Sequence, residues 1–91
     1  MAINFIELEL SQREAQLILE YGYPFEHEKN ALKAISSLPG YHQIKFEVGT
    51  AHGLIADLVY SAKKISDSSI LEEFDAICDV LDRAELAINN N

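Results

Sequence analysis

The side chains most often used for nucleophilic catalysis and metal binding are few in this chain: three histidines and one cysteine. His27, His42 and His52 lie in three different segments, and none belongs to an HxH or HExxH pattern. No sequence signature places a base beside Cys78, so we expect a small side chain in the core or at its edge. No nucleophile-elbow or paired-carboxylate motif accompanies these residues. We therefore predict no enzyme, no metal site and no cofactor.

A glycine-containing turn at residues 49–53 is a weak candidate for binding an anion. Backbone N–H groups at a helix start can hold a phosphate or carboxylate, and glycine permits close approach. The candidate residues are Gly49, Thr50, His52 and Gly53. The Lys-Ser/Thr pair of a P-loop is missing after the second glycine. A helix start with Thr50 as its N-cap is the simpler interpretation.

An aromatic loop at residues 21–28 is a candidate for binding a protein partner. Tyr23, Phe25 and the titratable His27 lie close together there, beside the rigid Pro24. Aromatic side chains on a fixed loop are typical of interaction hot spots. The alternative is that Tyr23 and Phe25 pack inward as the hydrophobic part of a helix stop.

An acidic stripe is predicted on the last helix. Glu72, Asp75, Asp79 and Asp82 are spaced 3, 4 and 3 residues apart, which places them on one helical face. Only Arg83, four residues after Asp79, can relieve their repulsion. The stripe is either a docking surface for a basic partner, imitating a row of phosphates, or an ordinary solvated face.

The elements that position these residues follow from hydrophobic periodicity. Residues 6–10 and 44–48 alternate apolar with charged side chains, as half-buried strands do. With four helical segments the order is β-α-α-β-α-α, a helix-dominated α+β fold in one domain over residues 1–91, frayed at 89–91. A hairpin of the two intervening helices makes the strands antiparallel. Two strands form a marginal sheet, so we predict a homodimer joined by strand edges or by the last helices.

Local signals place the helix boundaries. Ser11 and Glu14 form a capping box for the first helix, and Gly22 is expected to close that helix in the left-handed conformation. Ser69 and Glu72 offer a second capping box for the last helix. The third helix carries a wide apolar stripe and is expected to be largely buried. That stripe consists of Leu54, Ile55, Leu58, Val59, Ala62 and Ile65.

The last helix has the clearest apolar pattern in the chain. Its apolar residues are spaced 4, 3, 4, 3 and 4 residues apart, which is an a/d seam. Such a seam forms either part of the core or a dimer contact. The seam consists of Ile70, Phe74, Ile77, Leu81, Ala84 and Ile88.

Composition narrows the class of protein. The 91 residues are 48% hydrophobic and carry a net charge of −8. Residues 67–91 hold seven acids and one base, a net of −6, so the excess is concentrated at one end. A negative field repels phosphate backbones, which argues against direct nucleic-acid binding. No stretch approaches the ~18 apolar residues of a membrane helix, and one cysteine excludes an internal disulfide framework. These features favour the cytoplasm.

Three functions fit these observations. The first is a non-catalytic protein–protein interaction or regulatory module that forms a homodimer. The second is an acidic decoy that imitates nucleic acid and inhibits a basic nucleic-acid-binding protein. The third and weakest is a binder of a small ligand or anion at the turn of residues 49–53.

Overall fold

A computed structural model describes the backbone of residues 4–89 and the side chains of residues 4–87. The order of elements is β-α-α-β-α-α, so the predicted helix-dominated α+β fold is confirmed. The elements are β1 (Phe5–Ser11), α1 (Gln12–Tyr21), α2 (Glu26–Ser36), β2 (Tyr41–Glu47), α3 (Val48–Ala62) and α4 (Ser68–Asn89). Of the frayed end expected at residues 89–91, residues 90 and 91 lie outside the described part. No helix within that part is long and apolar enough to cross a membrane.

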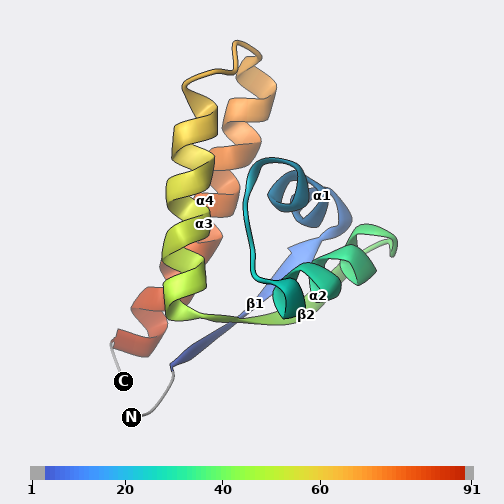
Figure 1. Ribbon diagram of the computed structural model, residues 1–91, viewed down its shortest axis with the longest axis vertical. Helices are drawn as coiled ribbons and strands as arrows, with labels where there is room; N and C mark the ends of the chain where they lie inside the picture. Colours follow the sequence, from blue (N-terminus) through green and yellow to red (C-terminus); the bar gives the residue numbers. More distant parts are fainter. Residues whose placement is uncertain (1–3, 90–91) are drawn as a thin grey trace.

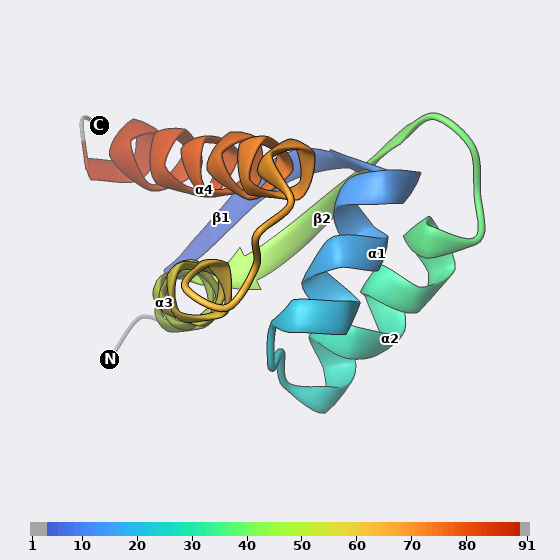
Figure 2. The ribbon, with the colours of Figure 1, turned by 90° about the horizontal axis from the view of Figure 1, so that it is seen from above.

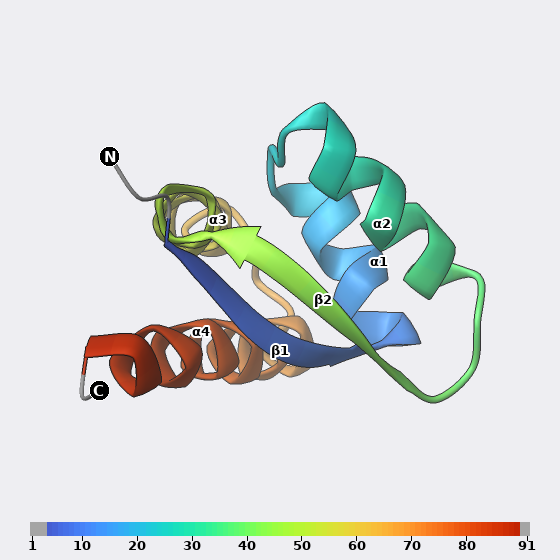
Figure 3. The ribbon, with the colours of Figure 1, turned by 90° about the horizontal axis from the view of Figure 1, so that it is seen from below.

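The two strands form an antiparallel sheet, as predicted. The register pairs Phe5 with Glu47 at one end and Ser11 with Tyr41 at the other. Side chains alternate between the two faces of each strand, and only one face is buried. All four helices cover that buried face, and no described element covers the opposite face of the sheet, which is termed the bare face (Figure 3).

The core lies between the sheet and the helices. α3 and α4 run side by side along the longest, 41 Å, dimension of the molecule (Figure 1), and α1 and α2 pack together beside them (Figure 2). The rings of Tyr21 and Phe74 pack edge to face, with 5.0 Å between their centroids, and join α1 to α4. The largest fully buried side chains are Phe46, Ile6, Leu10, Leu17, Ile18, Leu32, Leu54, Leu58, Ile77 and Leu81.

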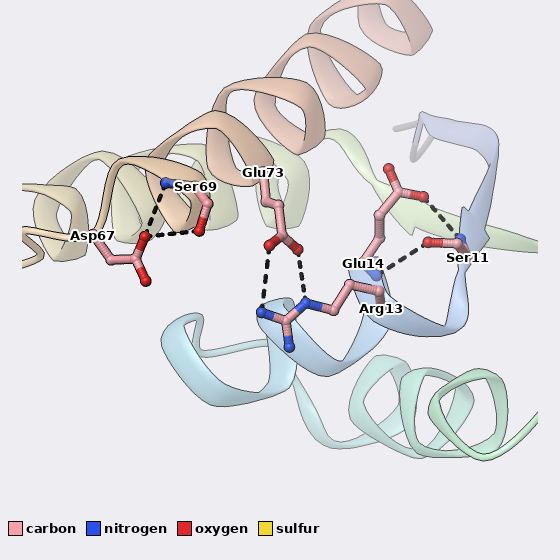
Figure 4. A network of polar contacts seen from close by, with 6 residues as sticks. All are labelled: Ser11, Arg13, Glu14, Asp67, Ser69 and Glu73. Atoms are coloured by element: carbon pink, nitrogen blue, oxygen red, sulfur yellow. Dashed lines mark hydrogen bonds and ion pairs between the residues drawn. The ribbon is translucent and has the colours of Figure 1, made fainter.

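Side-chain caps start α1 and α4 (Figure 4). The predicted capping box is present: Ser11 Oγ accepts the Glu14 N–H at 3.2 Å, and Glu14 Oε1 accepts the Ser11 N–H at 2.8 Å. At α4 the expected box between Ser69 and Glu72 is wrong, because the helix begins at Ser68, two residues before the start that a Ser69 N-cap implies. Asp67 Oδ1 accepts the backbone N–H of Ser69 at 2.9 Å and its hydroxyl at 2.7 Å. These bonds from Ser69 lower the pKa of Asp67.

Gly22 ends α1 for a different reason from the predicted one. Its φ is −105°, so it is not in the left-handed conformation. A Cβ at this position would lie 2.8 Å from Leu54 Cδ2 and 2.9 Å from the carbonyl oxygen of Ile18. Glycine is needed because the end of α1 packs closely against α3, where no side chain fits.

Candidate functional site

A buried carboxylate, Glu28, lies between the first turns of α2 and α3. The residue is 2% exposed. Its Oε1 accepts the Thr50 hydroxyl at 3.1 Å, and its Oε2 accepts the Glu47 backbone N–H at 3.3 Å. The partial positive charge at both helix N-termini favours a carboxylate there. α3 therefore begins at Val48 and is capped by a side chain from α2, so the expectation that Thr50 is the N-cap is wrong.

The four residues of the weak anion-binding candidate do not face one point. Thr50 is buried toward Glu28, whereas Gly49 and Gly53 are exposed. His52 is exposed and pairs with Glu85 of α4, with His52 Nε2 2.6 Å from Glu85 Oε1. An anion entering at the start of α3 would also meet the negative charge of Glu28. The geometry therefore gives no support to an external anion at residues 49–53.

The aromatic loop presents its side chains to solvent. Tyr23 is 85% exposed and Phe25 is 62% exposed, so these rings do not pack inward as a helix stop. His27 is also exposed, in the first turn of α2, and its Nε2 lies 3.6 Å from Glu28 Oε1. The structure thus brings Tyr23, Phe25 and His27 to one end of the α1–α2 pair.

The backbone of the aromatic loop is held against its neighbours. The Tyr23 N–H donates to Asp57 Oδ2 of α3 at 3.0 Å, and the Ser61 hydroxyl donates to the carbonyl of Tyr21 at 3.4 Å. The Gly22 N–H donates to the carbonyl of Ile18 at 2.8 Å. Two exposed aromatic rings therefore project from a fixed segment, which loses little conformational entropy when a partner binds.

All four residues of the acidic stripe are exposed on α4. Arg83 Nε lies 3.0 Å from Asp79 Oδ2, which is the relief expected from the sequence. Within the described side chains, the other three members, Glu72, Asp75 and Asp82, form no ion pair. The stripe is thus a continuous negative surface with one local cation.

A neighbouring acid of α4 has a structural role instead. Arg13 Nε donates to Glu73 Oε2 at 2.7 Å and joins α1 to α4 (Figure 4). This hydrogen bond to Glu73 raises the pKa of Arg13. Because Glu73 is paired, it does not add free negative charge to the acidic stripe beside it.

The apolar seam of α4 is part of the chain's own core. Phe74, Ile77 and Leu81 are buried, and Ile70 and Ala84 are half-buried against the same cluster. The side chain of the last member, Ile88, lies outside the described part. Because the central residues of the seam are already covered, two copies cannot pair their last helices through them while keeping this fold.

Cys78 and the histidines do not assemble a reactive centre. Burial, and to a smaller extent Asp75 and Asp82, raises the pKa of the half-buried Cys78 thiol, which disfavours the nucleophilic thiolate. His42 Nε2 lies 2.9 Å from the carbonyl oxygen of Pro39 in a surface turn. Among residues 4–87, no group of three His, Cys, Asp or Glu side chains is placed to hold a metal ion.

The bare face of the sheet holds a shallow hollow of about 240 Å³. It is lined by Glu7, Gln43, Ile44 and Lys45, and Lys45 Nζ lies 3.3 Å from Glu7 Oε1 across it. Because the charged pair neutralises itself and the walls are open, the hollow offers few groups that could orient a ligand.

Sequence reasoning missed two features of α3. The first is the cap of α3. Glu28 is distant from Thr50 in the chain, and no pattern in the residues around Glu28 indicates that this side chain is buried. The second is its outer side: the helix was expected to be largely buried, but Val59 is 53% exposed and Tyr60 is 61% exposed. Val59 belongs to the predicted stripe and lies at its exposed edge. The sequence feature that could have indicated this outer side is the near absence of charged residues in α3.

Protein-family models, curated proteins and solved structures were compared with this chain, and none of the three comparisons gave a match.

Proposed function

We propose that this protein is a non-catalytic protein–protein interaction or regulatory module, homodimeric and cytoplasmic, that binds a protein partner through Tyr23 and Phe25. The observation that supports it most is the exposure of these two rings on a fixed backbone. Burying an aromatic ring lowers the free energy of a protein in water, and clustered exposed apolar side chains mark interaction sites. Large aromatic residues are also the commonest energetic anchors of protein interfaces.

The experiment compares the double variant Tyr23→Ser/Phe25→Ser with wild type in a quantitative capture from host lysate. The matched control is Tyr41→Ser, because Tyr41 is a similarly exposed aromatic residue on the bare face of the sheet. We expect a set of proteins captured by wild type and by the control at low and high salt, and lost from the double variant. Contacts made by apolar rings depend little on ionic strength.

Two checks accompany this capture. The double variant should keep the melting temperature of wild type within a few degrees, because neither ring contributes to the core. If the folded double variant captures the same proteins as wild type in the same amounts, the aromatic loop is not the partner site.

The acidic stripe supports a second candidate, a decoy that occupies the basic groove of a nucleic-acid-binding protein. Four exposed acids follow one face of α4, and three of them have no ion pair among the described side chains. A row of carboxylates attracts basic surfaces at long range and gives association that weakens with salt.

The decoy is tested with Asp75→Lys/Asp79→Lys against the control Glu7→Lys/Glu9→Lys. Both variants change the net charge equally, but the control residues are exposed on the bare face of the sheet. We expect wild type and control to bind a basic partner in a salt-sensitive way, and the stripe variant to lose this binding. Binding that resists high salt, or that both variants lose equally, would contradict the decoy.

A further inference from the structure

We propose that the outer side of α3 is the surface through which two copies of this chain associate, with the two α3 helices antiparallel about a two-fold axis near Ala56. This inference rests on the homodimer of the proposed function and names its interface. In Figure 2 α3 is seen almost end-on. α4 lies on one side of it, the α1–α2 pair on another, and the end of β2 also contacts it. No other described element covers its outer side.

The outer side of α3 is apolar and exposed. The 15-residue helix carries one acid and no lysine or arginine, and the polar residue on its outer side, His52, is paired with Glu85 of α4. Helices of this kind are normally buried on every side. The exposed residues of α3 are Gly49, His52, Gly53, Ala56, Val59 and Tyr60.

Among the described residues, nothing requires the two glycines of this helix. Neither Gly49 nor Gly53 has a positive φ, and a Cβ added at either position would meet no atom of the described residues within 4 Å. Glycine within a helix lowers helix stability relative to alanine. A glycine with free space above its Cα allows a second helix to approach the backbone closely. Small residues have this role where two helices pack tightly.

The surface is complementary to itself. Gly49, Gly53, Ala56 and Tyr60 are spaced 4, 3 and 4 residues apart, the same spacing that packs a helical seam. An antiparallel pairing about Ala56 places the bulky Tyr60 of each copy over Gly53 of the other. A two-fold interface needs this match of one patch with itself.

Charge also favours this side of the molecule for self-association. Two copies with a net charge of −8 each repel one another, so their contact must avoid free carboxylates. The only acid of α3, Asp57, accepts the Tyr23 N–H at the margin of the surface. By contrast, joining two β1 edges would bring together two strands that each carry Glu9, which forms no ion pair among the described side chains. Two copies of the acidic stripe would also repel one another.

The first test measures the mass of the full chain by sedimentation from micromolar to millimolar concentration. We expect a dimer for wild type and for the control Tyr41→Asp, and a folded monomer for Tyr60→Asp. Loss of a central aromatic anchor should weaken dimerisation by about a hundredfold. Tyr41 and Tyr60 are both exposed, so circular dichroism should show the same fold for both variants.

The second test locates the two-fold axis by cross-linking. In a Cys78→Ser background, Ala56→Cys should form a disulfide-linked dimer under mild oxidation, because the two Cα atoms lie close together at the axis. Ala34→Cys, at an exposed position on α2, is the control and should not. A wild type that stays monomeric would overturn both the homodimer and this interface. A dimer that survives Tyr60→Asp, or does not cross-link through residue 56, would overturn the interface alone.

Discussion

Leu81→Ala should lower the free energy of unfolding by about 2–5 kcal/mol, the usual cost of truncating a fully buried leucine. Leu81 is fully buried in the middle of the α4 seam, with Ile77 one turn before it. The truncation removes apolar contacts and leaves a cavity that rigid neighbours fill only in part. Since small domains are stable by about 5–15 kcal/mol, a large share of the total stability is lost. Urea unfolding followed by circular dichroism measures the change.

Leu86→Ala is the matched control, because it is the same truncation on the same helix at an exposed position. Its expected cost is within about 0.5 kcal/mol. Both variants and wild type must be unfolded at one protein concentration, since association stabilises the folded state by mass action. Equal costs at positions 81 and 86 would mean that the seam does not lie in the core of the chain.

The sequence allowed the fold to be predicted wherever the signal is local. The alternation of residues 6–10 is a property of one strand, and the capping box of Ser11 and Glu14 spans one helical turn. Both were predicted and both are present. The antiparallel pairing followed from connectivity, since two helices that fold back return the chain beside β1 in the opposite direction.

Features that depend on contacts between distant segments could not be predicted. Gly22 looked like a helix stop, but the reason for glycine there is the side chain of Leu54 on another helix. The sequence left open whether Tyr23 and Phe25 are buried, because the answer depends on where α3 lies. The hydrogen bond from Tyr23 to Asp57 fixes the loop, and 34 residues separate the two.

The same limit applies to α3 and α4. Periodicity showed that each has an apolar side, and the described part of the α4 seam lies in the core. On α3, however, apolar residues extend beyond the side that the chain covers, as far as Val59 and Tyr60. A period of 3.6 residues predicts which residues share a side, but not how many neighbours are present to cover it.

The second large effect is expected at Glu28, where Glu28→Ala should lower the free energy of unfolding by about 2–3 kcal/mol. The change removes the cap of α3 and leaves the Glu47 N–H and the buried Thr50 hydroxyl without their acceptor. Glu28→Gln keeps one acceptor oxygen and should cost about half as much. The control Glu26→Ala, at an exposed position on the same first turn of α2, should cost within about 0.5 kcal/mol.

A double-mutant cycle separates the cap from the cost of burying a charge. Thr50→Val should be clearly destabilising in wild type and much less so in the Glu28→Ala background, because its hydrogen-bond partner is then already gone. Burial of a carboxylate is itself unfavourable, so its removal returns part of the free energy lost with the cap. If Glu28→Ala is as stable as Glu26→Ala, that desolvation cost cancels the cap. If Thr50→Val costs the same in both backgrounds, the hydroxyl and the carboxylate do not act together.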